Sequence, residues 1–257
     1  MLLAIDSGNT NTVFAVFEDN QLIGEWRAAT DPNRTADEHG VWLLQLLSAN
    51  NVDISSINET IIATVVPEAL FGLSGLSKKY FDSKPLVVGH PQVEIGIKIK
   101  LDDPSQIGAD RLANAVAGHK LYTGPLIIID FGTATTFDVI DQNGAYCGGV
   151  IAPGINLSLA ALDEAAARLP RIAIERPDSV IGSNTVAAMQ SGVYWGYVSL
   201  IEGLVKRITI EYGYKMKVVA TGGLAPIFSR ATAVIEEIDT DMTLRGLAYI
   251  NSLNRLV

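Results

Sequence analysis

Positive charge is scarce in this chain of 257 residues: 19 lysines and arginines stand against 28 aspartates and glutamates, a net charge of −9. This balance argues against binding to nucleic acid or to an anionic membrane, because both would be repelled. The single cysteine, Cys147, excludes an intrachain disulfide and a cysteine-based structural zinc site. No apolar run approaches the roughly 18 residues of a transmembrane helix, and Asp6 interrupts the apolar start that a secretory signal would need. We therefore expect a cytoplasmic protein.

Apolar material, in contrast, is plentiful. Hydrophobic residues make up 48% of the chain and charged residues 18%, which is typical of a globular protein with a substantial core. The length fits one large domain or two of about 130 residues each.

One pattern occurs twice. An apolar run over residues 2–5 leads into Asp-x-Gly-x-x-x-Thr at Asp6, and a run over residues 126–129 leads into the same motif at Asp130, without a gap. Strand-like segments separated by turns follow each copy, and then helical and strand patterns. The repeat predicts two copies of one α/β domain with a mixed sheet, which we place at residues 1–117 and 118–257.

Helices are predicted where capping signals precede apolar residues at helical spacing. Thr35 and Glu38 form a capping box before one helix, and Asp103-Pro104 starts another that carries residues 108–111 in its early turns. A long helix is expected over about residues 184–212. Glycines fall near one face of that helix, which indicates a close helix crossing, either within the chain or between two subunits; they are Gly192, Gly196 and Gly203.

The repeated turn is suited to bind phosphate, because a strand that runs into a glycine turn exposes several backbone N–H groups together. Threonine hydroxyls would add donors; the candidates are Thr10, Thr12, Thr133, Thr135 and Thr136. Asp6 and Asp130 would repel phosphate unless a cation such as Mg²⁺ lies between them. Either motif alone could be an ordinary hairpin, but the gapless repetition favours a phosphate site. A further turn, Thr221-Gly222-Gly223, suits the flat approach of a base or ribose.

A carboxylate stands next to a guanidinium at Asp110-Arg111. Most such pairs are ion pairs on a helix surface. The alternative is a general base for phosphoryl transfer beside an arginine that holds an anionic substrate. The two residues alone leave both readings open.

As a set, these motifs resemble the acetate and sugar kinase/Hsp70/actin superfamily, and within it the type III pantothenate kinases. The matching segments follow in order over nearly the whole chain: Asp6–Asn11, Gly108–Arg111, Asp130–Ala134, Gly149-x-x-x-Pro153-Gly154, Leu169-Pro170 and Gly182–Thr185. The resemblance implies two duplicated ribonuclease-H-like domains, each a mixed sheet with flanking helices, and an ATP cleft between them.

The resemblance also implies the reaction, transfer of the ATP γ-phosphate to the primary hydroxyl of pantothenate, which gives 4′-phosphopantothenate and begins coenzyme A biosynthesis. Asp110 becomes the catalytic proton acceptor and Arg111 the partner of the pantothenate carboxylate. The other substrate-binding positions are Gly108, Ala109 and Thr185. The ATP-binding residues are Asp6, Ser7, Gly8, Asn9, Thr10, Asn11, Thr12, Val13 and Thr133.

Two cation sites and a homodimer complete what the resemblance implies. Asp6 would hold the Mg²⁺ of Mg²⁺–ATP, and Asp130 matches a site for K⁺ or NH₄⁺, where the residues alone would suggest a second Mg²⁺ partner. The resemblance makes Thr185 a substrate contact, whereas the residue alone favours a role only as the cap of its helix. Leu101 stands where many family members have a tyrosine that contacts substrate, which puts substrate affinity in question rather than the chemistry.

Two other functions remain open from the sequence. One is a kinase of the same superfamily that acts on another small alcohol or sugar. The other is a regulator that binds nucleotide without catalysis, against which the intact Asp110-Arg111 pair argues.

Overall fold

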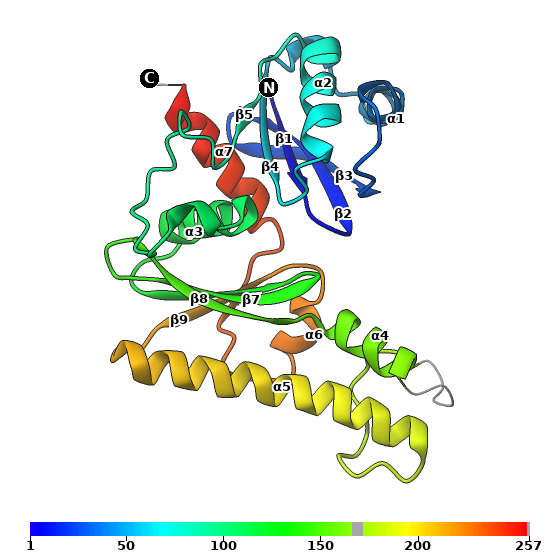
Figure 1. The fold of residues 1–257 in the computed structure, drawn as a ribbon, viewed down its shortest axis with the longest axis vertical. Helices are drawn as coiled ribbons and strands as arrows, with labels where there is room; N and C mark the ends of the chain where they lie inside the picture. The colour runs from blue at the N-terminus through cyan, green and yellow to red at the C-terminus, as the bar shows by residue number, and fades with distance from the viewer. Residues whose placement is uncertain (166–171, 256–257) are drawn as a thin grey trace. The chain divides into compact units, whose positions relative to one another are not determined.

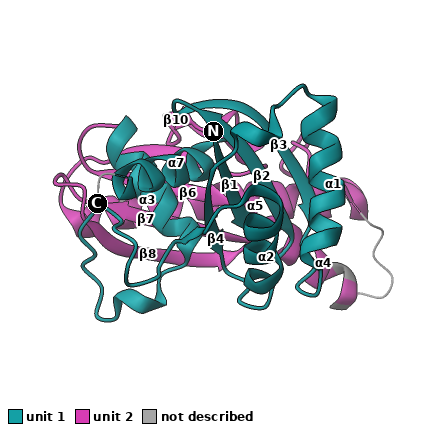
Figure 2. Cartoon of the chain, turned by 90° about the horizontal axis from the view of Figure 1, so that it is seen from above, with its two compact units in different colours: residues 1–121, 241–257 teal, residues 122–240 magenta. Residues whose placement is uncertain are grey.

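The computed structural model describes residues 1–165 and 172–255, which form two compact units (Figures 1 and 2). Unit 1 comprises residues 1–121 and 241–257, and unit 2 comprises residues 122–240. No helix in these two described stretches combines the length and the apolar character that crossing a membrane requires. The sequence places the domain boundary after residue 117. In the structure, the first part of unit 1 ends at residue 121, and the chain enters unit 1 again at residue 241.

Unit 1 is built on a five-stranded mixed sheet of order β3-β2-β1-β4-β5. The strands are β1 (Leu2–Ser7), β2 (Asn11–Glu18), β3 (Gln21–Ala29), β4 (Glu59–Thr64) and β5 (Leu86–Val87). The first three form an antiparallel meander, while β4 runs parallel to β1 and β5 parallel to β4. The carboxyl ends of β1 and β4 therefore lie side by side at one edge of the sheet.

Helices cover both faces of this sheet (Figure 1). Leu3 and Ile5 of β1 pack in one cluster with buried leucines of α1 (Ala36–Ala49) and α2 (Ala69–Phe81). The predicted capping box of Thr35 and Glu38 starts α1. The opposite face is covered by α3 (Ala109–Leu121) and α7 (Met242–Asn254).

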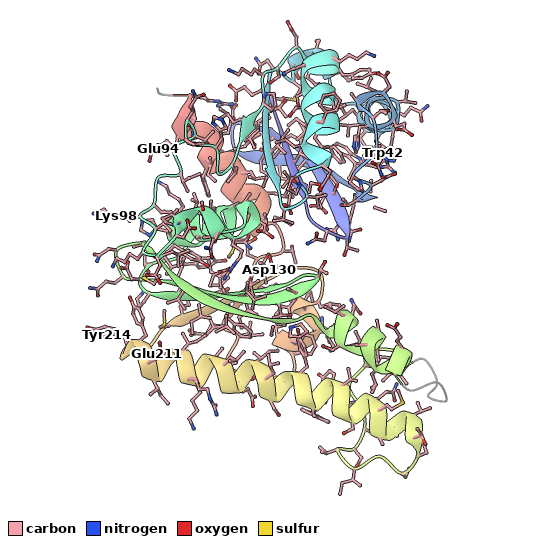
Figure 3. The ribbon with its side chains drawn as sticks, viewed as in Figure 1. Trp42, Glu94, Lys98, Asp130, Glu211 and Tyr214 are labelled. Carbon is pink, nitrogen blue, oxygen red and sulfur yellow. The ribbon has the colours of Figure 1, made fainter. Side chains whose placement is uncertain are left out.

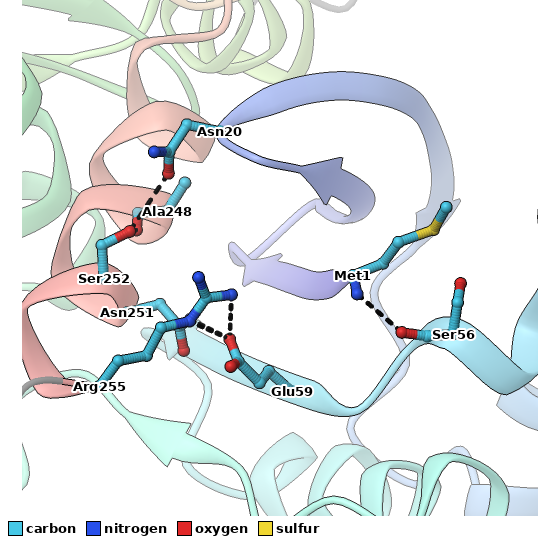
Figure 4. Close-up of polar contacts among 8 residues, drawn as sticks. All are labelled: Met1, Asn20, Ser56, Glu59, Ala248, Asn251, Ser252 and Arg255. Atoms are coloured by element: carbon cyan, nitrogen blue, oxygen red, sulfur yellow. Dashed lines mark hydrogen bonds and ion pairs between the residues drawn. The ribbon is translucent and has the colours of Figure 1, made fainter.

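The chain end belongs to unit 1 because α7 makes both close backbone contact and polar contacts there. A Cβ on Gly246 would lie 2.0 Å from the Ala113 carbonyl oxygen, so this crossing of α3 and α7 requires glycine. Arg255 forms an ion pair with Glu59, and the Asn251 side-chain amide donates to the same carboxylate at 2.6 Å (Figure 4). The sequence pattern of α7 shows its helical period but not which sheet it covers.

The helix predicted from Pro104 is divided in the structure. A single 3₁₀ turn, η2 (Pro104–Gln106), precedes the separate helix α3. The Asp103 carboxylate caps only this short turn, which ends before α3 begins at Ala109. Asp110 consequently lies in the first turn of α3.

Unit 2 repeats the topology of unit 1, with strand order β10-β9-β6-β7-β8. Its strands are β6 (Leu126–Phe131), β7 (Ala134–Ile140), β8 (Tyr146–Pro153), β9 (Lys217–Thr221) and β10 (Glu237–Ile238). The pairs β6·β7 and β7·β8 are antiparallel, and β6·β9 and β9·β10 are parallel. The duplication and the mixed α/β sheets expected from the repeated motif are thereby confirmed.

The long helix α5 (Thr185–Tyr212) covers one face of the second sheet (Figure 1). Asn184 caps its start, and Gly213 ends it in the left-handed conformation with φ 83°, close to the predicted limits. Two shorter helices, α4 (Ile155–Ala165) and α6 (Ala225–Ser229), were not predicted.

A buried histidine makes the stability of the protein depend on pH. His39 of α1 is 4% exposed, and its ring centroid lies 5.6 Å from that of Phe14. Burial, assisted by the Arg34 cation, lowers the pKa of His39 from 6.5 to about 4. Between these values the unfolded chain binds a proton that the folded protein does not, so stability is lost as the pH falls through this window.

We expect the free energy of unfolding to be about 2 kcal/mol smaller at pH 5 than at pH 7.5 through this group alone. Urea denaturation at both pH values measures the difference. His39→Leu should remove that part of it, whereas His119→Gln, at an exposed position, should retain it. The same pH dependence in both variants would contradict the assignment.

Candidate active site

The first Asp-x-Gly motif forms a tight hairpin at the carboxyl end of β1. Only residues 8–10 lie between β1 and β2, so Asp6 belongs to the strand rather than to the turn. The Gly8 N–H donates to the Asn11 carbonyl at 3.0 Å and closes the turn. The turn residues Asn9 and Thr10 are exposed, and Asp6 is half-buried. This arrangement leaves the tip of the turn accessible to a ligand.

The hydroxyls of Ser7 and Thr12 point into the protein instead of toward a ligand. The two residues are directly paired across β1 and β2, and they are 0% and 3% exposed. Their hydroxyl oxygens lie 3.0 Å apart. Thr12 therefore does not supply the phosphate donor that the sequence suggested, and these two positions can reach a nucleotide only through the backbone.

Asp110 is held in place by its neighbours on either side. Its Oδ1 accepts the Arg111 backbone N–H at 2.8 Å. A Cβ on Gly108 would lie only 2.5 Å from the same oxygen, so glycine makes room for the carboxylate. Asp110 and Arg111 are half-buried, and Ala109 is buried. The carboxylate thus has a defined position with an accessible side.

Val65, which directly follows β4, contacts both this segment and the first hairpin. Its N–H donates to the Ser7 carbonyl at 3.1 Å. Its Cγ1 lies 3.5 Å from the position of a Cβ on Gly108. Two segments that the sequence predicted separately, residues 6–13 and 108–111, therefore meet beside the carboxyl ends of β1 and β4. Ligands bind at this end of the strands in open α/β sheets.

In unit 2, oxygen atoms gather around Gly222, at the carboxyl ends of β6 and β9 (Asp130 is labelled in Figure 3). A Cβ on this residue would lie 2.7 Å from both Asp130 Oδ1 and the Phe131 carbonyl oxygen. Its φ of +86° also favours glycine. Carboxylate and carbonyl oxygens together are the donors that hard cations prefer. Asp130 is half-buried, so these donors fit a bound cation chemically.

The second hairpin has an accessible tip, as the first does. Gly132 and Thr133 are exposed, and Gly154 packs against their carbonyl groups, where a Cβ would lie 2.3 Å from the Thr133 oxygen. The hydroxyl of Thr135 is buried against that of Tyr197, and Thr136 donates to the Asp138 carboxylate at 3.2 Å. Of the five threonine hydroxyls suggested by the sequence, those of Thr12, Thr135 and Thr136 are thus bonded within the protein.

Thr185 is the first residue of α5 and is exposed, but it is not the cap. The Asn184 side chain accepts the Ala187 N–H at 2.9 Å and performs that function. The preceding Gly182 packs closely on the first turn, since its Cβ would lie 2.2 Å from the Ala188 nitrogen. The motif residues Leu169 and Pro170 lie outside the described residues.

Sequence reasoning missed three supporting residues around the hairpins. The Thr30 hydroxyl donates to the Gly8 carbonyl oxygen at 2.7 Å. The Thr64 hydroxyl lies 3.0 Å from the Val66 carbonyl oxygen and 3.3 Å from that of Ser7, and its single proton is directed between these two acceptors. Tyr197 donates to the Pro153 carbonyl at 3.2 Å in unit 2, and burial raises the pKa of its hydroxyl. Thr64 ends a buried strand parallel to β1, which could have identified it; Thr30 and Tyr197 carry no comparable signal.

Two copies of this sheet topology, each with an Asp-x-Gly hairpin at the carboxyl end of its central strand, define a member of the acetate and sugar kinase/Hsp70/actin superfamily. Solved structures share the fold. A protein from Campylobacter jejuni assigned to the Baf family of transcriptional activators has a TM-score of 0.61 at 20% identity, with 99% of this chain and 100% of that one covered. The activator of 2-hydroxyisocaproyl-CoA dehydratase from Clostridium difficile, with bound ADPNP, has a TM-score of 0.57 at 13% identity, with 100% and 97% covered.

The chain belongs to the type III pantothenate kinase family, and it is therefore an ATP-dependent kinase: the family model of that description matches residues 2–207. The type III pantothenate kinase of Rhodospirillum rubrum is 62% identical over 255 residues, with 99% of each chain covered. That of Paramagnetospirillum magneticum is 63% identical over 254 residues, with 99% of this chain and 98% of the relative covered.

Proposed function

We propose that this protein transfers the γ-phosphate of ATP to the primary hydroxyl of pantothenate, in the cytoplasm. The observation that carries the proposal is the position of Asp110, a half-buried carboxylate fixed between Gly108 and the Arg111 N–H beside the phosphate hairpin of the same unit. A carboxylate in this position can accept the hydroxyl proton as the phosphoryl group is transferred.

The other residues bind and orient the two substrates. The Arg111 guanidinium offers a planar set of donors to the pantothenate carboxylate. Gly108 and Ala109 have no side chain or only a methyl group, so they leave room for the substrate. Backbone N–H groups of residues 7–13 that are not paired within the hairpin bind the phosphates, and Thr133 contacts the nucleotide from the second hairpin. Thr185 contacts substrate from the exposed start of α5. Mg²⁺ carried by ATP and held through Asp6 would neutralise phosphate charge during transfer.

Asp130 is proposed to hold a monovalent cation, K⁺ or NH₄⁺, with the neighbouring Phe131 carbonyl as a second oxygen donor. The proposed site contains three carboxylates, Asp6, Asp110 and Asp130, in a chain of net charge −9. Binding of two anionic substrates there therefore depends on cations.

We expect activity to be lost in EDTA and restored by Mg²⁺, and to rise more than about tenfold when K⁺ or NH₄⁺ replaces Na⁺.

An ADP-release assay in matched chloride salts measures both effects. Asp130→Asn should remove most of the response to K⁺ while leaving the requirement for Mg²⁺. Full activity in EDTA, or an equal response to K⁺ in Asp130→Asn, would contradict the two cation assignments.

The rival activity within the superfamily is phosphorylation of another small alcohol or a sugar. The same assay distinguishes the two when pantothenate is compared with a panel of hexoses and short diols. We expect pantothenate to give the highest kcat/KM. A sugar with a higher value would reject the proposed substrate while preserving the kinase assignment.

We also propose that the protein is a homodimer assembled through α5. The observation that supports this is an exposed apolar surface at the start of α5 and in the segment before it, where Val180, Ile181 and Val186 are 64%, 87% and 41% exposed. On α5 itself, a Cβ on Gly192 or Gly196 would meet no atom within 4 Å among the described residues, so another helix can approach closely. Sedimentation equilibrium distinguishes a dimer from the monomer that would refute this assembly.

A further inference from the structure

Thr30, which follows the last residue of β3, binds the first hairpin turn at two points. Its hydroxyl donates to the Gly8 carbonyl at 2.7 Å. Its backbone N–H donates to the Thr10 carbonyl at 3.0 Å. The side chain and the backbone of one residue therefore hold both sides of the turn that is proposed to bind phosphate.

The direction of the hydroxyl chain behind this turn follows from counting protons. Thr30 gives its only hydroxyl proton to Gly8, so at its 2.9 Å contact with Thr12 it must accept. Thr12 then donates to Thr30, and Ser7 donates to Thr12 across 3.0 Å. The proton order is thus Ser7 to Thr12 to Thr30 to the Gly8 carbonyl, and Thr30 is the last member and the one that contacts the turn.

This arrangement determines where two amide groups point. None of the described peptide bonds is cis, and in a trans peptide the C=O and the following N–H point in opposite directions. The Gly8 and Thr10 carbonyls both point to Thr30. The N–H groups that follow them, those of Asn9 and Asn11, therefore both point away from Thr30. Two N–H groups presented together in a glycine turn form a concavity suited to an anion.

We propose that Thr30 is a positioning residue for the nucleotide phosphates. It fixes the orientation of the peptides after Gly8 and Thr10, so that the N–H groups of Asn9 and Asn11 are ready for the ligand before it binds. This inference rests on the proposed function in one respect, the assignment of this hairpin to the phosphates of ATP. Thr30 itself touches the turn and need not touch the nucleotide.

The test compares Thr30→Val, which removes the hydroxyl at nearly constant shape, with Thr30→Ser, which keeps it. The matched control is Thr60→Val in β4: Thr60 is 2% exposed, and its hydroxyl has no partner within the described residues. Three readouts are needed: KM for ATP and for pantothenate, the Kd of a non-hydrolysable ATP analogue by calorimetry, and amide hydrogen exchange of residues 8–12.

Thr30→Val should raise KM for ATP and the Kd of the analogue by about tenfold, the effect of one lost hydrogen bond, while KM for pantothenate changes less than about twofold. Exchange at residues 8–12 should accelerate. Thr30→Ser should restore all three readouts to within about threefold of wild type, and Thr60→Val should leave them unchanged.

Three results would overturn the inference. They are an unchanged affinity for nucleotide in Thr30→Val, an equal rise in both KM values, and a Thr30→Ser variant no better than Thr30→Val. The calorimetric Kd distinguishes failure of this inference from failure of the proposed function. If the wild type binds the analogue but does not phosphorylate pantothenate, the proposed reaction is rejected. The comparison of Kd values between the variants still decides the role of Thr30. A wild type that binds no nucleotide would reject both.

Discussion

Replacing Asp110 by asparagine is expected to lower kcat by about 10³-fold, the usual contribution of a positioned general base. The amide cannot accept the hydroxyl proton of pantothenate, but its oxygen can still accept the Arg111 N–H at the 2.8 Å contact seen for the carboxylate. The start of α3 should therefore keep its geometry. Coupled ADP release at saturating substrates measures kcat, and urea denaturation verifies that stability is retained.

Asp102→Asn is the matched control, because it makes the same chemical change at an exposed position shortly before α3. It should keep kcat within about twofold of wild type, as most surface substitutions do. Turnover of Asp110→Asn at the level of this control would show that another group accepts the proton, and the proposed role of Asp110 would have to be abandoned.

Gly108→Ala should reduce kcat by about 10²-fold with little loss of stability. The new Cβ would lie 2.5 Å from Asp110 Oδ1, so the carboxylate must move, and displacement of a catalytic group by about 1 Å has an effect of this size. The side chain can turn aside, so the backbone need not shift. Gly246→Ala gives the opposite case: its Cβ would lie 2.0 Å from the backbone oxygen of Ala113, and it should destabilise the fold.

A double-mutant cycle shows whether Gly108→Ala acts through Asp110. In the Asp110→Asn background, Gly108→Ala should lower kcat by only about threefold more, because the group it displaces no longer contributes. Steady-state kinetics of the four proteins gives the coupling directly. Additive losses would mean that the alanine interferes with substrate binding instead, and KM for pantothenate would then rise.

The general architecture could be predicted because its determinants are local and repeated. Apolar runs over residues 2–5 and 126–129, each followed by the same Asp-x-Gly spacing, were enough to predict two related mixed sheets, and both are observed. The long helix was also predictable, since Asn184 and Gly213 carry the signals for its start and end. These features depend on residues that are near one another in the sequence.

Side-chain direction in the hairpins was predictable in principle but was missed. Alternation along β1 places Ser7 on the same face as Leu3 and Ile5, and Thr12 lies directly opposite Ser7. Treating the whole motif as an open loop gave Thr12 a hydroxyl free for phosphate. The short turn observed, residues 8–10, puts that hydroxyl inside the protein instead.

Other features depend on contacts between distant segments, which spacing does not reveal. Thr30 lies far along the chain from the carbonyl oxygen of Gly8 to which it donates. Likewise, α7 contacts Glu59 of β4 and Ala113 of α3, which are both distant from it in the sequence. A helical period in α7 shows that one side is apolar, but either sheet could bury it. Only the structure shows that residues 241–257 belong to unit 1.

The most direct test of the central claim is to identify the product formed from pantothenate and Mg²⁺–ATP by the purified protein. We predict one ADP released per pantothenate consumed, a product heavier by one phosphoryl group, and phosphorus NMR coupling that places the ester on the primary hydroxyl. ATP binding without a phosphorylated product, or a phosphate on any other group of pantothenate, would contradict the account.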